Sequence, residues 1–227
     1  MEELNDIEKI KESIEIVSSI SPHVRRVPHN HINVIYIIRE YMKENCKNYL
    51  EIGTYHGGSI ITSMQSEYKC NFYGLDFYGA GLNGEFDKPG NQSVNDEVSI
   101  ETTKISIEKL NKHNHFFELI QADSQLDTTF DILKDKIKDG VDLLLIDGCH
   151  TYDCVLRDFE LYSKLVNKGG FICFDDYFFI EEVRQAVNNI NFDDYEIIGN
   201  IKSCPENSSL NESLDSSLNS TFIVKKK

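Results

Sequence analysis

The stretch that decides the fold of this chain is residues 141–177, VDLLLIDGCHTYDCVLRDFELYSKLVNKGGFICFDDY. A run of apolar residues ends at Asp147, a helical stretch follows, and a second apolar run after a Gly-Gly pair ends at Asp175 and Asp176. We expect a strand, a helix, a tight turn at the glycines and a second strand. Because the two strands of such a unit are parallel, both acidic ends emerge at the same edge of the sheet. Open α/β sheets bind ligands in the crevice outside that edge.

His150 adds an imidazole to this predicted edge, three residues after Asp147. Gathering Asp147, Asp175 and Asp176 at one place is costly unless a cation neutralises them. Taken singly, each of these residues has an ordinary alternative role in a helix cap or a turn. The four together favour a reactive site over a structural role.

The rest of the chain alternates between extended and helical patterns. Short apolar runs predict further strands at 49–53, 71–78, 116–124, 195–201 and 220–226. Helical spacing of apolar residues predicts helices at 3–19, 30–45, 61–68, 98–112, 127–138 and 180–190. Glycine-rich or polar loops are expected at 77–97 and 202–219. Alternating strands and helices indicate an α/β fold, with a mostly parallel sheet and helices on both faces.

Composition limits the class of protein. The formal net charge of −15 argues against nucleic acids and anionic membranes as partners. The sequence contains no run of 18 apolar residues, so we expect no membrane-spanning segment. The six cysteines form no CxxC pair and are interpreted as reduced thiols of a cytoplasmic protein. We expect one domain over 47–227, preceded by a helical segment over 1–46 that caps the substrate site or forms an oligomer contact.

A glycine-rich turn follows the first predicted strand, in the sequence EIGTYHGGS at 51–59. Glycines allow a tight turn and let a ligand approach main-chain N–H groups. About 20 residues later, Asp76 ends the second predicted strand, where an acid accepts hydrogen bonds from ribose hydroxyls in dinucleotide folds. The glycines stand at 53, 57 and 58, so the GxGxxG pattern of nicotinamide enzymes is not met. This spacing weakens a hydride-transfer hypothesis.

The pattern E-x-G-x-x-x-G resembles motif one of class I S-adenosylmethionine-dependent methyltransferases. The whole turn at 51–59 is similar to that of catechol-type O-methyltransferases, including the Tyr and the Ser. The resemblance implies that the turn and Ser59 bind the methionine moiety, that Asp76 binds the ribose, and that the residues after the third strand lie against the adenine. The implied cofactor-binding residues are Glu51, Gly53, Thr54, Tyr55, Gly57, Ser59, Asp76, Asp123 and Ser124.

The stretch 141–177 resembles the signature of macrocin- and mycinamicin-type sugar O-methyltransferases. The matching residues are Asp147, Gly148, His150, Tyr152, Asp158, Gly169, Gly170, Asp175 and Asp176. The two resemblances together cover roughly 48–178. They imply a Rossmann-like three-layer sandwich with a mostly parallel seven-stranded sheet and an antiparallel closing strand. They also imply Asp147, Asp175 and Asp176 as metal ligands and His150 as the base, while Asp158 is expected to be structural because it lies inside a helix.

These residues favour a magnesium-dependent O-methyltransferase that acts on a sugar, a glycan or another polyhydroxylated small molecule. Carboxylates suit Mg²⁺, and a metal-bound hydroxyl loses its proton more readily to a nearby base. His150 and Asp147 are therefore the predicted catalytic residues, with S-adenosylmethionine and Mg²⁺ as cofactors. Two alternatives stay open at this point: a nicotinamide-dependent oxidoreductase, and a nucleotide-binding module without catalysis. The sequence leaves the acceptor and the oligomeric state open.

Overall fold

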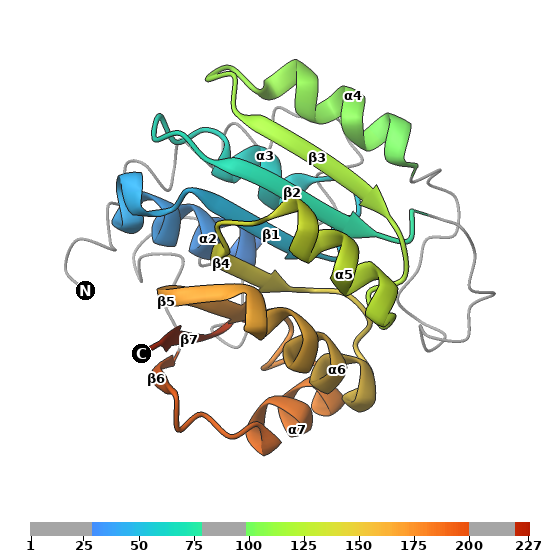
Figure 1. The fold of residues 1–227 in the computed structure, drawn as a ribbon, viewed down its shortest axis with the longest axis vertical. Coiled ribbons are helices and arrows are strands. Elements are labelled where there is room, and N and C mark those ends of the chain that lie inside the picture. The colour runs from blue at the N-terminus through green and yellow to red at the C-terminus, as the bar shows by residue number, and fades with distance from the viewer. Residues whose placement is uncertain (1–28, 79–98, 200–220) are drawn as a thin grey trace, which may run out of the picture.

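A computed structural model describes residues 29–78, 99–199 and 221–227 of the chain (Figure 1). The helix predicted over 3–19 and the loop predicted over 202–219 lie outside the described residues, as does most of the loop predicted over 77–97. The proposed capping or oligomer role of the N-terminal segment therefore stays a prediction.

The described part of the chain forms one seven-stranded sheet in the order β3-β2-β1-β4-β5-β7-β6. Its strands are β1 (Asn48–Ile52), β2 (Asn71–Asp76), β3 (Phe116–Gln121), β4 (Val141–Ile146), β5 (Val166–Phe174), β6 (Tyr195–Gly199) and β7 (Phe222–Lys226). The first five strands pair in parallel, whereas β7 is antiparallel to both of its neighbours. The predicted mostly parallel sheet with an antiparallel closing strand is confirmed.

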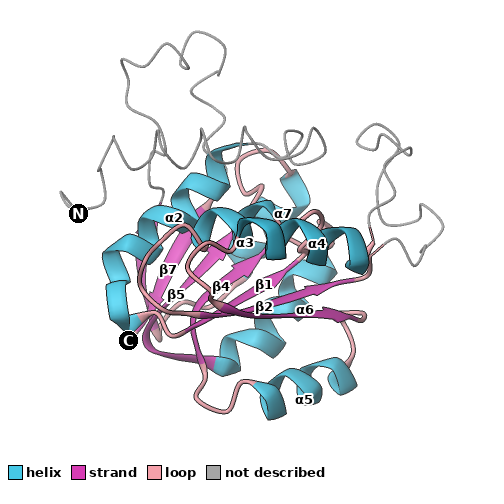
Figure 2. Ribbon diagram, turned by 90° about the horizontal axis from the view of Figure 1, so that it is seen from above, coloured by secondary structure: helices cyan, strands magenta, loops and turns pink. Residues whose placement is uncertain are grey.

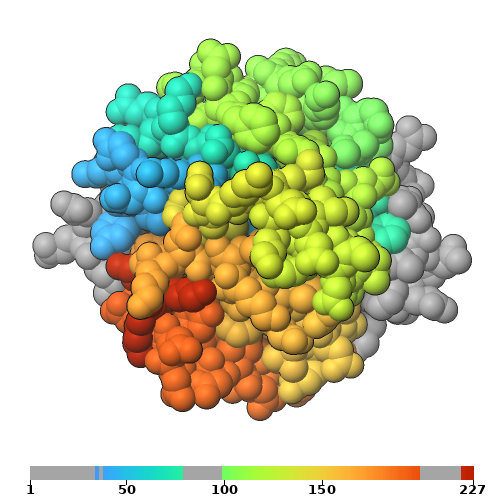
Figure 3. Space-filling view, in the orientation of Figure 1, coloured from blue at the N-terminus to red at the C-terminus, as the bar shows by residue number. Residues whose placement is uncertain are grey.

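Helices cover both faces of this sheet, which makes three layers (Figure 2). One face carries α2 (His29–Met42), α3 (Gly58–Ser63) and α4 (Ile100–Leu110), and the other carries α5 (Asp127–Lys136), α6 (Tyr152–Tyr162) and α7 (Glu181–Asn189). In Figure 3, residues coloured yellow-green to orange, which include α5 and α6, occupy the middle of the second face. Of the helices among the described residues, none has the length and hydropathy to cross a membrane.

Strand β4 shows why its sequence is apolar without alternation. Leu143 and Leu145 belong to the core beneath α2 and α3, whereas Leu144 and Ile146 belong to the core beneath α5 and α6. A central parallel strand is buried on both faces, so these four positions favour apolar side chains. Asp142, near the start of β4, is partly exposed and accepts hydrogen bonds from the amides of Lys47 and Asn48. The short three-residue helices η3 (Lys43–Asn45) and η4 (Ser163–Leu165) lead into β1 and β5.

Helix α2 is part of the core of this domain. Its residues Val34, Ile35 and Ile38 are buried in the same cluster as the apolar side chains of α3. Arg39 is fully buried, and its guanidinium group donates to the carbonyl of Cys46 at 3.0 Å and to that of Tyr68 at 2.8 Å. The last part of the segment predicted over 1–46 therefore packs firmly against the sheet.

Helix α3 begins and ends earlier than the predicted 61–68. It starts at Gly58 and ends at Ser63, after which the main chain closes tighter turns. The imidazole Nε2 of His115 lies 3.1 Å from the carbonyl oxygen of Met64 and 2.9 Å from that of Ser66. Both carbonyls lie beyond the end of α3. The last carbonyls of the helix itself are satisfied by tight turns, since the amides of Gln65 and Ser66 donate to the carbonyls of Thr62 and Ser63.

The predicted Gly-Gly turn before the last parallel strand is instead an irregularity inside β5. Its pairing with β4 shifts between Val141 and Leu143, where residues around Gly169 are looped out of register. Gly169 has a φ of +80°, a conformation that glycine adopts without steric cost. The strand thus starts at Val166, before the glycines, and the sequence signal marked a bulge.

Candidate active site

Acidic residues collect where the parallel strands end. Asp76 is the last residue of β2, Asp147 follows β4 directly, and Asp175 and Asp176 follow β5. Asp123 follows β3 by two residues. Strands β2 and β3 lie on one side of β1, and β4 and β5 lie on the other. The strand order therefore reverses between β1 and β4. Ligands of open α/β sheets bind at such a switch point.

The turns after β1 and β4 are in main-chain contact at this switch point. The amide of Gly53 donates to the carbonyl of Leu75 at 2.8 Å, and the amide of Asp147 donates to the carbonyl of Ile52 at 2.8 Å. A Cβ atom on Gly53 would lie 1.8 Å from the carbonyl oxygen of Asp147, and Gly53 has a φ of +91°. Only glycine fits here, so the predicted cofactor turn and the predicted catalytic residue belong to one packed unit.

The predicted cofactor turn is held from two sides. The amide of Tyr55, which has a φ of +47°, donates to Asp76 Oδ2 at 2.7 Å, and the amide of Tyr78 donates to Asp76 Oδ1 at 2.8 Å. The hydroxyl of Thr103 on α4 donates to the carbonyl of Tyr55 at 2.9 Å. Asp76 therefore fixes the shape of the turn as well as standing at the predicted ribose position.

Three other predicted cofactor residues lie buried beneath the turn. Glu51, Thr54 and Ser59 are 1%, 2% and 3% exposed. The carboxylate of Glu51 accepts a hydrogen bond from the hydroxyl of Tyr49, whose pKa is raised by burial and by the charge of Glu51. These buried residues pack under and within the turn, and Gly57, with a φ of +79°, closes it against α4. The cofactor-binding roles of Glu51, Thr54 and Ser59 stay predictions.

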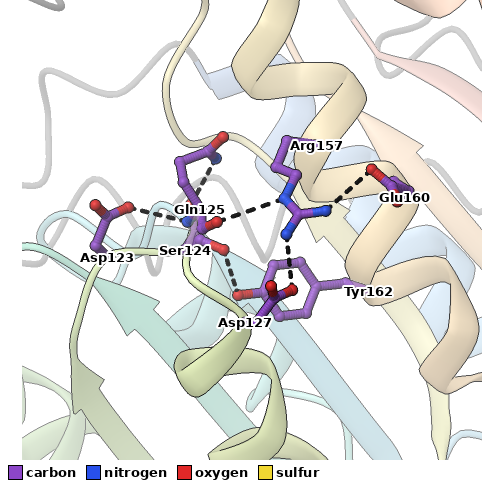
Figure 4. A network of polar contacts seen from close by, with 7 residues as sticks. All are labelled: Asp123, Ser124, Gln125, Asp127, Arg157, Glu160 and Tyr162. Atoms are coloured by element: carbon purple, nitrogen blue, oxygen red, sulfur yellow. Dashed lines mark hydrogen bonds and ion pairs between the residues drawn. The ribbon is translucent and has the colours of Figure 1, made fainter.

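The loop after β3 is organised around Gln125 (Figure 4). Its main-chain amide donates to Asp123 Oδ1 at 2.9 Å, and its side-chain Nε2 donates to Ser124 Oγ at 3.0 Å. The hydroxyl of Tyr162 on α6 donates to the carbonyl of Ser124 at 2.7 Å. The sequence predicts Asp123 and Ser124 for the cofactor site, and the structure adds Gln125 as their hydrogen-bonded neighbour.

Arg157 ties the same loop to α6 from the solvent side (Figure 4). Its guanidinium group pairs with Asp127 at 2.7 Å and with Glu160 at 3.1 Å, and its Nε lies 3.5 Å from the carbonyl of Gln125. The main chain of the loop is therefore fixed independently of the side chains that it presents.

The acidic edge itself brings together Asp147, His150 and Asp176, whose ligand atoms all lie within 4.8 Å of one another. His150 Nε2 lies 3.6 Å from Asp147 Oδ1 and 3.3 Å from Asp176 Oδ2. Asp176 has a φ of +56°, and its carbonyl accepts from the amides of Phe179 and Ile180. The imidazole thus lies between two carboxylates from different strand ends.

Asp175 is placed differently from its neighbour. Its side chain is 4% exposed, and Oδ1 accepts a hydrogen bond from the hydroxyl of Thr221, just before β7, at 3.3 Å. It is not among the side chains that form the acidic group in the described part of the chain. The sequence predicted Asp147, Asp175 and Asp176 as one ligand set, and the structure brings Asp147 and Asp176 together with His150.

The donor set of this group suits a divalent cation. Two carboxylate oxygens are the ligands that Mg²⁺ prefers, with water and substrate oxygens completing its shell. An imidazole nitrogen in the same group also suits transition metals. All three side chains are partly exposed, so a substrate has access to them.

Comparison with known proteins identifies the family of the chain. Residues 50–177 match a family model described as a methyltransferase domain. A relative, the uncharacterized protein R132 of Acanthamoeba polyphaga mimivirus, is 34% identical over 169 residues, which are 73% of this chain and 68% of the relative.

Solved structures share the fold at low identity. A putative caffeoyl-CoA O-methyltransferase from Staphylococcus aureus is 18% identical with a TM-score of 0.59, covering 98% of this chain and 93% of its own. An O-methyltransferase from Bacillus cereus, solved in complex with SAH, is 15% identical with a TM-score of 0.56, covering 97% and 91%. The calicheamicin enzyme CalS11, a TDP-rhamnose 3'-O-methyltransferase, is 11% identical with a TM-score of 0.57, covering 96% and 93%. The chain belongs to the methyltransferase-domain family, and its fold is the one found in S-adenosylmethionine-dependent O-methyltransferases.

Proposed function

We propose that this protein transfers the methyl group of S-adenosylmethionine to a hydroxyl of a sugar, a glycan or another polyhydroxylated small molecule, with the help of a divalent cation, Mg²⁺. The observation that carries the proposal is the group formed by Asp147, His150 and Asp176 at the switch point of a methyltransferase fold. The contact between Gly53 and Asp147 joins this group to the cofactor turn.

The cofactor would bind along the ends of β1, β2 and β3. In this proposal the turn at 53–57 takes the methionine moiety, Asp76 takes the ribose hydroxyls, and Asp123 and Ser124 lie against the adenine. Two observations support this placement. All these residues border the same edge of the sheet, and Asp76, Asp123 and Ser124 are partly exposed. Gln125 is added to this set because its side chain is hydrogen-bonded within the same loop.

Methyl transfer to oxygen is a displacement in which the hydroxyl must lose its proton. A bound divalent cation would make that proton more acidic. Asp147 and Asp176 would hold the cation. Asp175, the third ligand predicted from the sequence, is buried next to Asp176 in the chain, and the titration below tests its part. His150 is proposed as the base that accepts the proton, because two carboxylates hold its imidazole in place at 3.6 and 3.3 Å.

The proposed acceptor has neighbouring hydroxyl groups, since two oxygens on one ligand complete the shell of a cation better than one. The similar enzyme CalS11 is named for action on a nucleotide sugar, which supports an acceptor of this kind. Phe178 and Phe179 follow the acidic group and are 42% and 43% exposed, so apolar surface is available beside it for the ring of a sugar or a larger aglycone.

Calorimetric titration with S-adenosylhomocysteine, with and without MgCl₂, tests the proposal. We expect micromolar binding of S-adenosylhomocysteine and a separate binding heat for Mg²⁺. Asp176→Asn should lose the Mg²⁺ heat and keep cofactor binding, whereas Asp153→Asn, which removes an exposed carboxylate from α6, should keep both. Asp175→Asn decides whether the buried neighbour belongs to the ligand set.

Two results would contradict the proposal. Binding of a nicotinamide dinucleotide in place of S-adenosylhomocysteine would favour the oxidoreductase hypothesis, which the match to the methyltransferase family already argues against. Cofactor binding without methyl transfer to any member of a hydroxyl-rich acceptor library, at saturating Mg²⁺, would favour the non-catalytic module.

A further inference from the structure

Asp158 is a fully buried carboxylate on α6, close to the proposed cofactor site. Its Oδ1 accepts a hydrogen bond of 2.7 Å from the side-chain amide of Gln125. Its Oδ2 is buried and receives no hydrogen bond from the residues that the structure describes. A Cβ atom on Gly148 would lie 3.4 Å from that oxygen, so the carboxylate packs against the loop that carries Asp147 and His150.

Asp158 therefore lies between two loops of the proposed active site. The loop after β3 presents Ser124 and Gln125, and the loop after β4 presents Gly148 and its neighbours. Tyr162 and Arg157 already hold the main chain of the first loop (Figure 4). What Asp158 adds is control of two polar side chains of that loop: the Gln125 amide, which in turn donates to Ser124 Oγ, and the Ser124 hydroxyl, whose contact lowers the pKa of the carboxyl group.

Burying a carboxylate at this position lowers the stability of the fold. The pKa of Asp158 is raised to about 7, chiefly by burial and also by the charge of Asp123, although the contacts with Ser124, Gln125 and Arg157 lower it. Tyr162 and Cys154, on the same helix, are the other titratable groups facing it, and the pKa of each is raised chiefly by burial. An apolar side chain would fill such a site at lower cost. Groups held at such cost are concentrated at functional sites.

We propose that Asp158 is a positioning residue of the cofactor site: it orients the Gln125 amide and the Ser124 hydroxyl toward the adenine side of the cofactor, while it supports the loop of Asp147 from below through Gly148. The inference rests on the proposed function, because it needs a nucleoside at the loop after β3. Asp158 itself touches neither cofactor nor acceptor.

Titration calorimetry with S-adenosylhomocysteine between pH 6 and pH 8 tests this role. The ionised carboxylate is the better acceptor for Gln125, so wild-type affinity should rise with pH over this range. Asp158→Asn, which has the same shape, should weaken binding at pH 8 by about 10-fold, since hydrogen bonds to a charged group are roughly twice as strong as neutral ones. Its affinity should no longer change with pH, whereas Asp153→Asn should behave as the wild type.

A double-mutant cycle distinguishes positioning from general damage. Gln125→Met should lose most of the pH dependence with Asp158 still in place, and this holds even if Asp158→Asn fails to fold. In the Gln125→Met background, Asp158→Asn should cause little further loss of affinity. In turnover, Asp158→Asn should raise the KM for S-adenosylmethionine more than it lowers kcat.

The outcomes separate the two proposals. A wild-type protein that binds no S-adenosylhomocysteine at any pH would reject the proposed function itself. A wild-type protein that binds it, with equal affinity and pH profile in Asp158→Asn, would reject only the positioning role. Fully additive effects of Asp158→Asn and Gln125→Met would do the same.

Discussion

The main chain of Gly53 lies so close to the carbonyl of Asp147 that a methyl group on Gly53 would come within 1.8 Å of that oxygen. This contact joins the end of β1 to the end of β4 without any side chain between them. The proposed cofactor turn and the proposed catalytic residues are therefore at a fixed spacing before any ligand binds. In-line transfer needs such a fixed geometry between the donor and the acceptor.

Replacing Gly53 by alanine should disrupt this contact. The added methyl group would meet main-chain atoms, and the φ of +91° is strained for alanine. We expect a loss of unfolding free energy of about 4 kcal/mol or more, measured by urea denaturation, because overpacking and backbone strain act together. Gly169→Ala is the matched control: it has a φ of +80° but nothing within 4 Å, so about 1–2 kcal/mol of strain is expected. Equal losses in the two variants would contradict the packing argument.

His150→Gln should slow methyl transfer while leaving S-adenosylhomocysteine affinity within a few-fold of the wild type. A general base contributes about 10²–10⁴-fold to turnover, and we expect a loss of that size. Single-turnover kinetics at saturating cofactor measure it. If Mg²⁺ affinity falls in this variant by as much as in Asp176→Asn, His150 is a metal ligand, as its distances of 3.6 and 3.3 Å also allow.

Asp76→Asn should weaken cofactor binding more than it slows chemistry. The carboxylate accepts hydrogen bonds from the amides of Tyr55 and Tyr78. Its loss should therefore loosen the turn and weaken the hydrogen bonds to the ribose hydroxyls. Hydrogen bonds to a charged group contribute about 1.5–3 kcal/mol, which predicts a rise of roughly 10- to 100-fold in the Kd for S-adenosylhomocysteine. An unchanged Kd with a reduced kcat would assign Asp76 to the acceptor side.

The pH dependence of stability should carry the signature of Asp158. Its pKa is about 7 in the folded protein against 3.8 for the unperturbed group, so the folded state holds the proton more strongly. Its contribution is fully present below about pH 4 and is lost as the pH rises through 7, by on the order of 1.4 kcal/mol per unit. Asp158→Asn should therefore gain stability relative to the wild type between pH 5 and pH 8. Urea denaturation of both proteins at pH 5 and pH 8 measures this. A difference in unfolding free energy that is the same at both pH values would show that the Asp158 carboxyl does not titrate in this range.

Much of the fold could be predicted from local patterns. The stretch 141–177 gave two parallel strands with acidic ends, since a buried central strand is apolar throughout and a polar residue marks its end. The position of the helices followed from apolar spacing, as in α7, predicted over 180–190 and found over Glu181–Asn189. The boundaries predicted for α3 were wrong: the helix begins at Gly58, directly after the glycine-rich turn, and the main chain leaves it through tight turns on the carbonyls of Thr62 and Ser63.

The candidate site could be predicted only in part. The sequence brought Asp147, His150 and Asp176 to one edge, and the structure places their ligand atoms within 4.8 Å of one another. It gave no sign that Asp175 is buried against Thr221, because two adjacent residues at a strand end point in different directions. The role of Asp175 as a metal ligand stays a prediction, which the Mg²⁺ titration of Asp175→Asn tests.

The sequence by itself determined the class of the fold, the acidic strand ends and the glycine-rich turn, because each depends on short-range patterns of apolar, acidic and glycine residues. Only the tertiary structure decided which of these features touch. The contact of Gly53 with Asp147 spans more than 90 positions, and that of Gln125 with Asp158 joins two elements at 2.7 Å across 33 positions. Such contacts arise from the packing of the sheet and its helices, and burial there gives the Asp158 carboxyl properties that no local pattern encodes.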